Sequence, residues 1–570
     1  MHKKNYKTIN YFNPMVTNSP LARKSTEAIE RLYITMRHLF YRGSFRVSGN
    51  SGNALRDLLL RLNPEIYGSI SDPNKVELDG LNYVLDRLPQ GIEECAYINL
   101  TAAEGYNDAT FEVIVPAKRR RNCYRIDEEQ MNIEVSRGRS EIYDVLTHLT
   151  FFYHEADKIR DKAIGTNLKK PNRLWQKLEE FIFSQEPVTD KARAVALMHL
   201  SDILGRTYEE VYRAHESFST PNKPDRLFHV VYWMGRLSQL DALGEIHREI
   251  AFTATLISQI GHHATGEKWA NQIKKVLYDN NLIHRPLHII SSNMHSVMNM
   301  LFAHHALGET YVEEEKFSVY EKLSSKHHKA LREKVNEYAT KAGMLKIEDT
   351  SGANINVQII DLQNLNLKET AFSEFKSKDA VLLVMDYAFG EQAFEVMDEL
   401  LKPYKAHETR THMKVESISI MGKAGILEGQ KGDIIVPTSH VFEGTADNYP
   451  FHNELTFSDF CNEELGVYQG MMITVLGTSL QNKDLLHFFR DTSWGCVGLE
   501  MEGAHYHKAI QIASKIRGHI QPDIKVRYAY YASDNPLETG STLASGGLGL
   551  TGVRPTYLIT KKIIEQILKD

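Results

Sequence analysis

Two short segments near the C-terminus carry side chains that suit the cleavage of a bond between a sugar and a base. One contains Glu500-Met501-Glu502 and the other Ser533-Asp534. Breaking an N-glycosidic bond needs an acid for the departing base and acceptors for the hydroxyls of the cation-like sugar. A carboxylate accepts hydrogen bonds from two vicinal hydroxyls, and a partly buried aspartate with a raised pKa keeps a proton for a ring nitrogen. Glu502 and Asp534 could divide these two tasks.

The sequence around these residues predicts rigid elements that would hold them in place. Residues 525–532 are mostly apolar and rich in tyrosine, which predicts a strand, and residues 533–536 are turn formers that would end it. Asp534 is therefore expected at the carboxyl end of a strand, where open α/β sheets bind their ligands. Residues 500–515 have apolar side chains at helical spacing and predict the start of a helix.

The length and composition indicate a globular protein of several domains. The chain has 570 residues, of which 42% are hydrophobic and 25% are charged. This length corresponds to roughly two to four domains. The formal net charge of −6 provides no global positive field for nucleic acid or an anionic membrane, so neither is expected as a partner.

The cysteines and the N-terminus indicate a soluble, cytoplasmic protein. The four cysteines are widely spaced and form no zinc-like CxxC pair, a pattern that fits a reducing cytoplasm, and no metal ligands are expected. Residues 1–19 are polar and lack the apolar run of a signal peptide. Nowhere is there an apolar run long enough to span a membrane.

The periodicity of the apolar residues divides the chain into two expected domains. Residues 1–345 have apolar stripes at helical spacing, with short strand-like runs at 96–100 and 111–115. We expect there a mainly α-helical region of one or two subdomains with a small β element, and residues 287–306 are among its expected helices. In residues 346–570 strand-like and helical runs alternate, which is typical of an α/β sheet flanked by helices.

Several blocks of the C-terminal domain resemble the nucleoside phosphorylase and nucleosidase superfamily, in the order in which the superfamily has them. Its members include purine nucleoside phosphorylase, methylthioadenosine nucleosidase and AMP nucleosidase. The resemblance covers residues 378–570. Residues 380–401 resemble a strand, glycine turn and helix of the superfamily, and residues 420–427 with 431–436 resemble its central glycine-rich turn and next strand. The implied fold is a mixed sheet flanked by helices.

The resemblance assigns roles to the two C-terminal segments. Glu500-Met501-Glu502 matches a Glu-Met-Glu motif whose last glutamate binds the ribose 2′ and 3′ hydroxyls and whose methionine packs on the sugar. Ser533-Asp534 matches a Ser-Asp pair whose aspartate is the general acid toward a purine, and the extension at 535–540 is most similar to AMP nucleosidase. By the same resemblance the nucleophile would lie near Gly422, Lys423 and Gly425.

Two departures from the superfamily bear on the nucleophile. Ile420 stands where hexameric purine phosphorylases carry a phosphate-binding arginine, and residues 422–425 are closer to the Gly-x-Ala-Gly of hydrolytic nucleosidases. Hydrolysis is therefore favoured over phosphorolysis, in which inorganic phosphate would be the co-substrate; no other cofactor is expected. Methylthioadenosine nucleosidase activates its water with a glutamate, and residues 354–365 carry no matching signature. The residue that activates the nucleophile stays unassigned.

Two segments of the N-terminal region could also bind a ligand. The basic run at 118–121 is either a solvated loop or a clamp for phosphate or a nucleotide. Residues 285–299 concentrate polar groups in an apolar context, with His288, His295 and Asn299 at spacings that share one helical face. Such a buried polar face is satisfied either internally or by a ligand.

Three classes of function fit the sequence. The first is an enzyme that cleaves the N-glycosidic bond of a purine nucleoside or nucleotide. The second is a sensor that binds a nucleotide without turnover and controls the N-terminal region. The third is an oligomeric scaffold whose N-terminal helices contact partner proteins, since the resemblance implies a homo-oligomer. The sequence does not identify the base or the substituent at the 5′ carbon.

Overall fold

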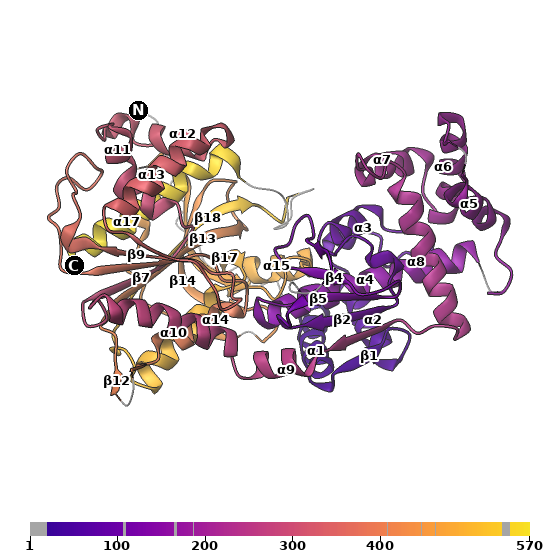
Figure 1. The fold of residues 1–570 in the computed structure, drawn as a ribbon, viewed down its shortest axis with the longest axis horizontal. Coiled ribbons are helices and arrows are strands. Elements are labelled where there is room, and N and C mark those ends of the chain that lie inside the picture. The colour runs from indigo at the N-terminus through magenta and orange to yellow at the C-terminus, as the bar shows by residue number, and fades with distance from the viewer. Residues whose placement is uncertain are drawn as a thin grey trace.

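The computed structural model describes residues 20–570 except 107–109, 165–167, 186, 407–408, 446, 462 and 539–547. Two large sheets, each with its own helices, lie side by side (Figure 1). The expected mixed α/β character is confirmed. Within the described residues, no helix combines the length and the apolar composition needed to cross a membrane.

The N-terminal lobe, residues 20–261, is built on a six-stranded sheet in which β2 is parallel to both β5 and β6. This sheet is larger than the small β element expected, because four of its strands are short and lack a clear apolar run. Its order is β1 (Ser44–Arg46), β6 (Glu249–Phe252), β2 (Tyr97–Thr101), β5 (Gln130–Glu134), β4 (Cys123–Arg125) and β3 (Val113–Ile114).

Helix α4 (Gly138–Ala163) is the central helix of this lobe and is buried along most of its length. It packs against α8 (Arg226–Leu243) and α2 (Asn50–Leu62). The other helices are α1 (Pro20–Arg42), α3 (Leu78–Leu85), α5 (Arg173–Phe183), α6 (Asp190–Leu204), α7 (Tyr208–Phe218) and α9 (Ala254–Gly261).

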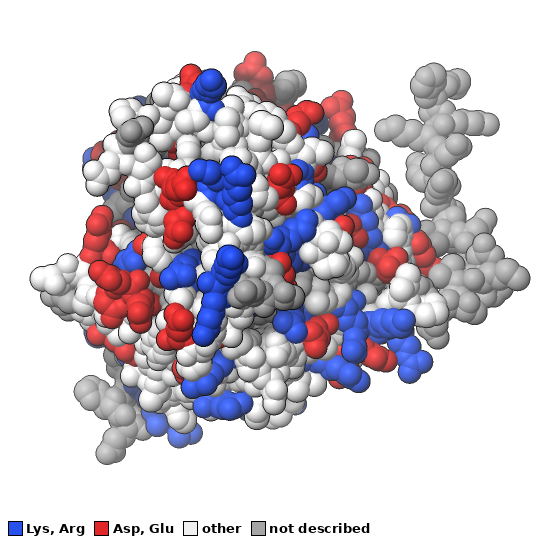
Figure 2. Space-filling model, turned by 90° about the vertical axis from the view of Figure 1, so that its right-hand side faces the viewer, with Lys and Arg blue, Asp and Glu red and all other residues white. Residues whose placement is uncertain are grey.

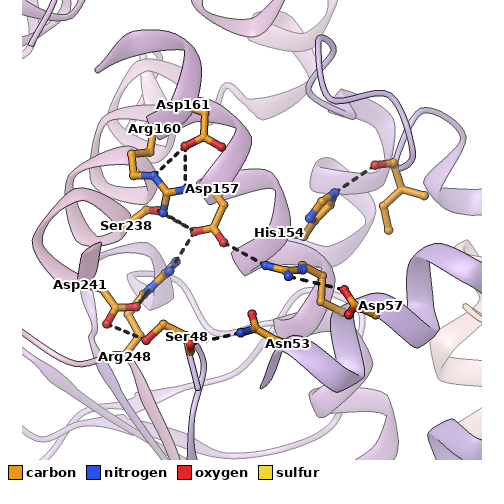
Figure 3. A network of polar contacts seen from close by, with 12 residues as sticks. Ser48, Asn53, Asp57, His154, Asp157, Arg160, Asp161, Ser238, Asp241 and Arg248 are labelled. Atoms are coloured by element: carbon orange, nitrogen blue, oxygen red, sulfur yellow. Dashed lines mark hydrogen bonds and ion pairs between the residues drawn. The ribbon is translucent and has the colours of Figure 1, made fainter. Parts of the chain in front are cut away.

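A buried ion-pair network ties these helices together around Arg248 (Figure 3). The Arg248 guanidinium, with 2% of the residue exposed, donates to Asp241 of α8 and to Asp157 of α4, each at 2.9 Å. Asp157 also accepts from Arg160 and from Ser238. Burial by itself would raise the pKa of Asp157, but the positive charges of Arg248 and Arg160 outweigh it and lower that pKa.

We predict that Arg248→Met destabilises the protein by about 3–5 kcal/mol, because Asp241 would keep a buried charge without its partner. The measurement is the denaturant midpoint of the full chain. Arg23→Met is the control, since the Arg23–Glu27 pair is exposed and such pairs contribute about 0–1 kcal/mol. Equal midpoints for the two variants would contradict the structural role of the network.

The C-terminal lobe, residues 264–570, is built on a ten-stranded sheet, part of which closes into a ring. Around the ring each strand pairs with the next, and the last pairs with the first. At one point Gly425 is the register partner of both Leu499 and Asp534. The ring therefore brings the carboxyl ends of three strands together. Its strands are β13 (Val415–Ile426), β18 (Lys525–Asp534), β14 (Ile434–Phe442), β16 (Val467–Thr474) and β17 (Cys496–Glu500).

The remaining strands extend this sheet from β13, and helices cover both of its faces (Figure 1). The strands are β7 (Leu287–Ser291), β10 (Val381–Met385), β9 (Val357–Asp361) and β8 (Leu345–Ile347), with β15 (Asn448–Pro450) beside β14 and a separate hairpin of β11 (Tyr404–Ala406) and β12 (Thr409–Thr411). The helices are α10 (Ala264–Asp279), α11 (Ser296–Leu307), α12 (Ser318–Ser324), α13 (Lys329–Lys341), α14 (Gln392–Leu401), α15 (Lys483–Asp491), α16 (Gly503–Gln511) and α17 (Val553–Lys569).

One expected helix is wrong in its first nine residues. Residues 287–306 were expected to be helical throughout, but Leu287–Ser291 forms β7, which is parallel to β10 and β13, and the helix begins at Ser296. A short apolar run that is buried on both faces reads equally well as a helix or as a parallel strand. Because β7 precedes residue 345 and lies inside the second sheet, a boundary at 345 does not separate the two sheets.

The two lobes share one apolar core. The buried cluster of the N-terminal lobe continues into side chains of the ring and of α15, among them Leu427, Ile473 and Leu485. Helix α1 packs against α15, and the Asn482 amide donates to Leu62 O at 2.9 Å. This interface fixes how the N-terminal lobe faces the ends of the ring strands.

Candidate functional site

A large cavity of about 1240 Å³ lies where the two lobes meet. We call it the central cavity. Its C-terminal side is formed by the carboxyl ends of β7, β10, β13, β17 and β18, and its N-terminal side by basic segments that precede β4 and α4. Known ligand sites span about 300–1,000 Å³, so the cavity has room for a ligand of nucleotide size. Glu500, Met501, Glu502, Ser533, Gly422 and Lys423 all line it.

Glu500 holds the turn that presents Glu502. One Glu500 carboxylate oxygen accepts from the Thr474 hydroxyl at 2.6 Å, and the other accepts from the backbone N–H of Glu502 at 2.5 Å and from that of Gly503. Burial raises the pKa of Glu500 to about 7. The predicted helix begins at Gly503, so Glu500 ends β17 and Glu502 lies in the turn between the two elements.

Glu502 is fixed by a glycine of the loop that follows β10. Its Oε1 accepts from the backbone N–H of Gly390 at 2.9 Å. Burial and the neighbouring charge of Glu500 raise the pKa of Glu502 to about 8. Gly390 has a φ of 55°, and a Cβ there would lie 2.3 Å from the Ser140 hydroxyl oxygen. The position therefore requires glycine for its backbone conformation and for its close approach to α4.

Asp534 is the last residue of β18 and follows Ser533, which lines the cavity, but Asp534 is not itself part of the cavity wall. The Ser533 hydroxyl bonds to Asp534 Oδ1 and lies 3.1 Å from Ala424 O. Asp534 Oδ2 is buried and has no hydrogen-bond partner among the described residues. Burial raises the pKa of Asp534. A carboxyl group that holds its proton in this way can donate it to a ligand.

Lys423 is near both acidic groups. Its side chain is exposed to the cavity and forms no ion pair with any described residue. Its positive charge lowers the pKa of both Glu502 and Asp534, against the larger effect of burial, so it is close to both. Gly425 is not part of the cavity wall. It joins β17 to β18 behind that wall, which gives it a structural position instead of the ligand contact predicted for it.

Aromatic side chains and two further polar groups complete the C-terminal wall. Tyr387, Phe389, Tyr506, Tyr530 and Tyr531 present flat surfaces on which a base can stack.

His295 and Asp386 follow the carboxyl ends of β7 and β10 and also line the cavity. Burial lowers the pKa of His295, and the charge of Asp386 partly opposes that shift. Asp386 was missed from the sequence, although its place directly after the apolar run of β10 is a signal that could have found it.

The polar segment at 285–299 reaches the cavity only in part. His295 and Asn299 line it, whereas His288 lies in β7 and its Nδ1 is 2.8 Å from the Ser417 hydroxyl oxygen. The three do not share one helical face, because the strand ends between them. Asn299 also donates to the Tyr557 hydroxyl at 2.7 Å.

We predict that Gly390→Ala disrupts the Glu502 turn and lowers the stability of the protein by about 2–4 kcal/mol, the sum of a left-handed backbone and a steric clash. Gly308→Ala is the matched control, because Gly308 has a φ of 72° but open space around its Cβ position. The melting temperature, Tm, is the measurement. Adding Ser140→Gly should restore part of the loss in Gly390→Ala; if it restores nothing, the clash is not the cause.

Comparison with known proteins gives a family and a set of solved structures. The profile of a family of unknown function (DUF6909) matches residues 53–315 and 310–569. No curated protein matches the chain.

Three solved structures share part of the fold at low identity. The first is 5′-methylthioadenosine/S-adenosyl homocysteine nucleosidase of Campylobacter jejuni, with 11% identity, 50% of this chain and 100% of that chain covered, and a TM-score of 0.30. The second is isoform 2 of uridine phosphorylase from Schistosoma mansoni, with 11% identity, 53% of this chain and 90% of that chain covered, and a TM-score of 0.29. The third is a futalosine hydrolase mutant of Helicobacter pylori, with 10% identity, 49% of this chain and 99% of that chain covered, and a TM-score of 0.27. At these scores the argument for function rests on the cavity itself.

Proposed function

The chain belongs to the DUF6909 family of unknown function, and we propose from its central cavity that it cleaves the N-glycosidic bond of a purine nucleoside or nucleotide by hydrolysis. The observation that carries the proposal is that Lys423 of β13 and Glu502, which follows β17, line one cavity, and that Asp534 at the end of β18 directly follows the lining residue Ser533. A base, a sugar and the bond between them could then be held by separate groups.

The two carboxyl groups have the properties that the proposed roles need. Asp534 is protonated over a wider pH range than an ordinary aspartate, since burial raises its pKa, and it would donate that proton to the departing purine. Glu502 would accept hydrogen bonds from the ribose 2′ and 3′ hydroxyls, with Met501 against the sugar. Lys423, whose charge acts on both carboxyl groups, would stabilise negative charge near the reacting bond.

Hydrolysis is favoured over phosphorolysis by the wall near Lys423. Ile420 lines the cavity. By the resemblance to the nucleoside phosphorylase and nucleosidase superfamily, it stands where hexameric purine phosphorylases carry an arginine. His295 and Asp386 are the candidates for activating the attacking water, because both are ionisable, line the cavity and interact electrostatically with each other.

We predict that Asp534→Asn lowers kcat for base release about 10²–10⁴-fold, the usual contribution of a general acid. The assay measures free base from purine nucleosides and 5′-nucleotides, with and without phosphate. Asp523→Asn is the control, since Asp523 is exposed. Release by the wild type that strictly requires phosphate would instead indicate a phosphorylase, and the absence of release from every substrate by folded protein would contradict an enzyme.

We predict that nucleoside binding releases a proton and strengthens as the pH rises toward about 8. The pKa of Glu502 in the empty cavity is about 8, and hydroxyl donors favour its carboxylate form, so binding lowers that pKa. Calorimetry in two buffers of different ionisation enthalpy measures the released proton. Glu502→Gln should abolish both the release and the pH dependence; if both persist, Glu502 is not the group that meets the hydroxyls.

A nucleotide sensor without turnover is the second candidate. The cavity is shared by both lobes, so a ligand in it would alter how they contact each other. Such a sensor would bind its ligand with Asp534 as a hydrogen-bond donor and would release no base.

A further inference from the structure

The N-terminal lobe contributes five cationic side chains to the wall of the central cavity. They are Arg87, Lys118, Arg119, Arg120 and Arg137. They come from three separate segments: the turn after α3, the connection between β3 and β4, and the residue immediately before α4. Folding alone brings them together, which suggests that their common charge serves the cavity.

Part of this positive charge is already neutralised. Arg119 donates to both carboxylate oxygens of Asp144, at 2.9 and 2.7 Å. Arg121, which points away from the cavity, pairs with Asp144 at 2.7 Å and with Glu141 at 3.2 Å. These two carboxylates therefore balance Arg119 and Arg121.

Arg87, Arg120 and Arg137 have no such counter-ion. None of the three forms an ion pair within the part of the chain that the structure describes. The Arg87 guanidinium lies 3.4 Å from the centroid of the Tyr83 ring and donates from Nη1 to Tyr83 O at 2.8 Å, whereas its Nε is buried without a hydrogen-bond partner. Only 7% of Arg87 is exposed. A buried guanidinium without a counter-ion is costly unless a ligand supplies one.

The surroundings of Arg137 also carry an excess of positive charge. Burial lowers the pKa of Arg137, and the charges of Arg120, Arg121 and Arg119 lower it further against the opposing effect of Glu141. Arg137 also precedes the first turn of α4, where the helix dipole adds partial positive charge. The cluster thus has an excess of positive charge that an anion would relieve.

Three of the other cations of the cavity are engaged elsewhere. Arg332 donates to Leu323 O and Ser325 O, Lys329 pairs with Glu333, and Lys346 pairs with Glu348. Apart from Lys423 on the C-terminal side, the unpaired positive charge is therefore concentrated on the N-terminal wall.

The contacts along the cavity place this wall next to the sugar site. Asp534 and Leu499, which lies three residues before Glu502, are both register partners of Gly425. Glu502 accepts from Gly390 N–H, and the preceding Phe389 ring lies 6.0 Å from the guanidinium carbons of both Arg119 and Arg137. The order is therefore an acid, a hydroxyl acceptor and a cationic cluster. A nucleotide has the matching order of base, ribose and phosphate.

We propose that the central cavity binds a purine nucleoside 5′-phosphate whose phosphate group lies among Arg87, Arg120 and Arg137. The assignment of base and ribose rests on the proposed function. Arginine suits this task because its planar fork binds two phosphate oxygens at once, and a phosphate carries more charge than a carboxylate.

The face of the N-terminal lobe in Figure 2 has Lys and Arg interspersed with Asp and Glu, which is unlike a surface for nucleic acid.

The test is calorimetric binding to the full-length protein, with adenosine, inosine and guanosine compared with their 5′-monophosphates and with inorganic phosphate. We expect the best 5′-monophosphate to bind at least about 100-fold more tightly than its nucleoside, as two or more charge-assisted contacts provide. Arg137→Gln and Arg120→Gln should each reduce that ratio about tenfold and leave nucleoside binding unchanged. Arg120 is exposed, so its variant keeps the fold; Arg173→Gln, outside the cavity, is the control.

The possible outcomes separate this inference from the proposed function. Arginine-dependent binding of a 5′-monophosphate without base release would support the phosphate site and contradict the enzyme. Base release at equal rates from nucleoside and 5′-monophosphate, unaffected by either variant, would overturn the phosphate site alone. Arginine-dependent binding of inorganic phosphate with no preference for the 5′-monophosphate would overturn it in favour of a site for free phosphate. Absence of all binding would contradict both.

Discussion

The pairing of β13 with both β17 and β18 at Gly425 is the constraint on which the site depends. Gly425 pairs with Leu499 of β17 and with Asp534 of β18, and a Cβ on Gly498 would lie 2.7 Å from the Gly425 carbonyl oxygen. Gly498 thus permits β13 and β17 to approach closely enough to close the ring. Glu502 follows one strand and Asp534 ends another, so residues far apart in the sequence reach one cavity.

The N-terminal lobe holds the loop that contacts Glu502. The loop that binds Glu502 is held on its other side by α4, because the Ser140 hydroxyl accepts from the Glu391 N–H at 2.8 Å and Arg139 pairs with the Glu391 carboxylate at 2.8 Å. The hydroxyl acceptor and the arginine cluster are consequently parts of one packed unit. Glu502 and Asp534 belong to the C-terminal lobe and the arginines without a counter-ion belong to the N-terminal lobe, so the proposed site needs both lobes.

The sequence predicted the elements that carry the two acidic groups, and it missed the relations between distant segments. Residues 525–532 form most of β18, and the segment after Glu502 is helical, because their apolar periodicity is local information. The strand β7 was mistaken for helix since a short buried segment with only three apolar residues, Leu287, Ile289 and Ile290, has no distinctive period. The placement of Arg87, Arg120 and Arg137 beside Glu502 depends on how the two lobes pack, and no spacing within the sequence records it.

The central claim is that one cavity positions base, ribose and phosphate in that order. The most direct test is a crystal structure of Asp534→Asn with a purine 5′-monophosphate bound. The account predicts the base beside residue 534, the ribose hydroxyls within hydrogen-bond distance of Glu502, and the phosphate in contact with Arg137 and its neighbours. A ligand in the reverse orientation, or one bound outside the cavity, would contradict it.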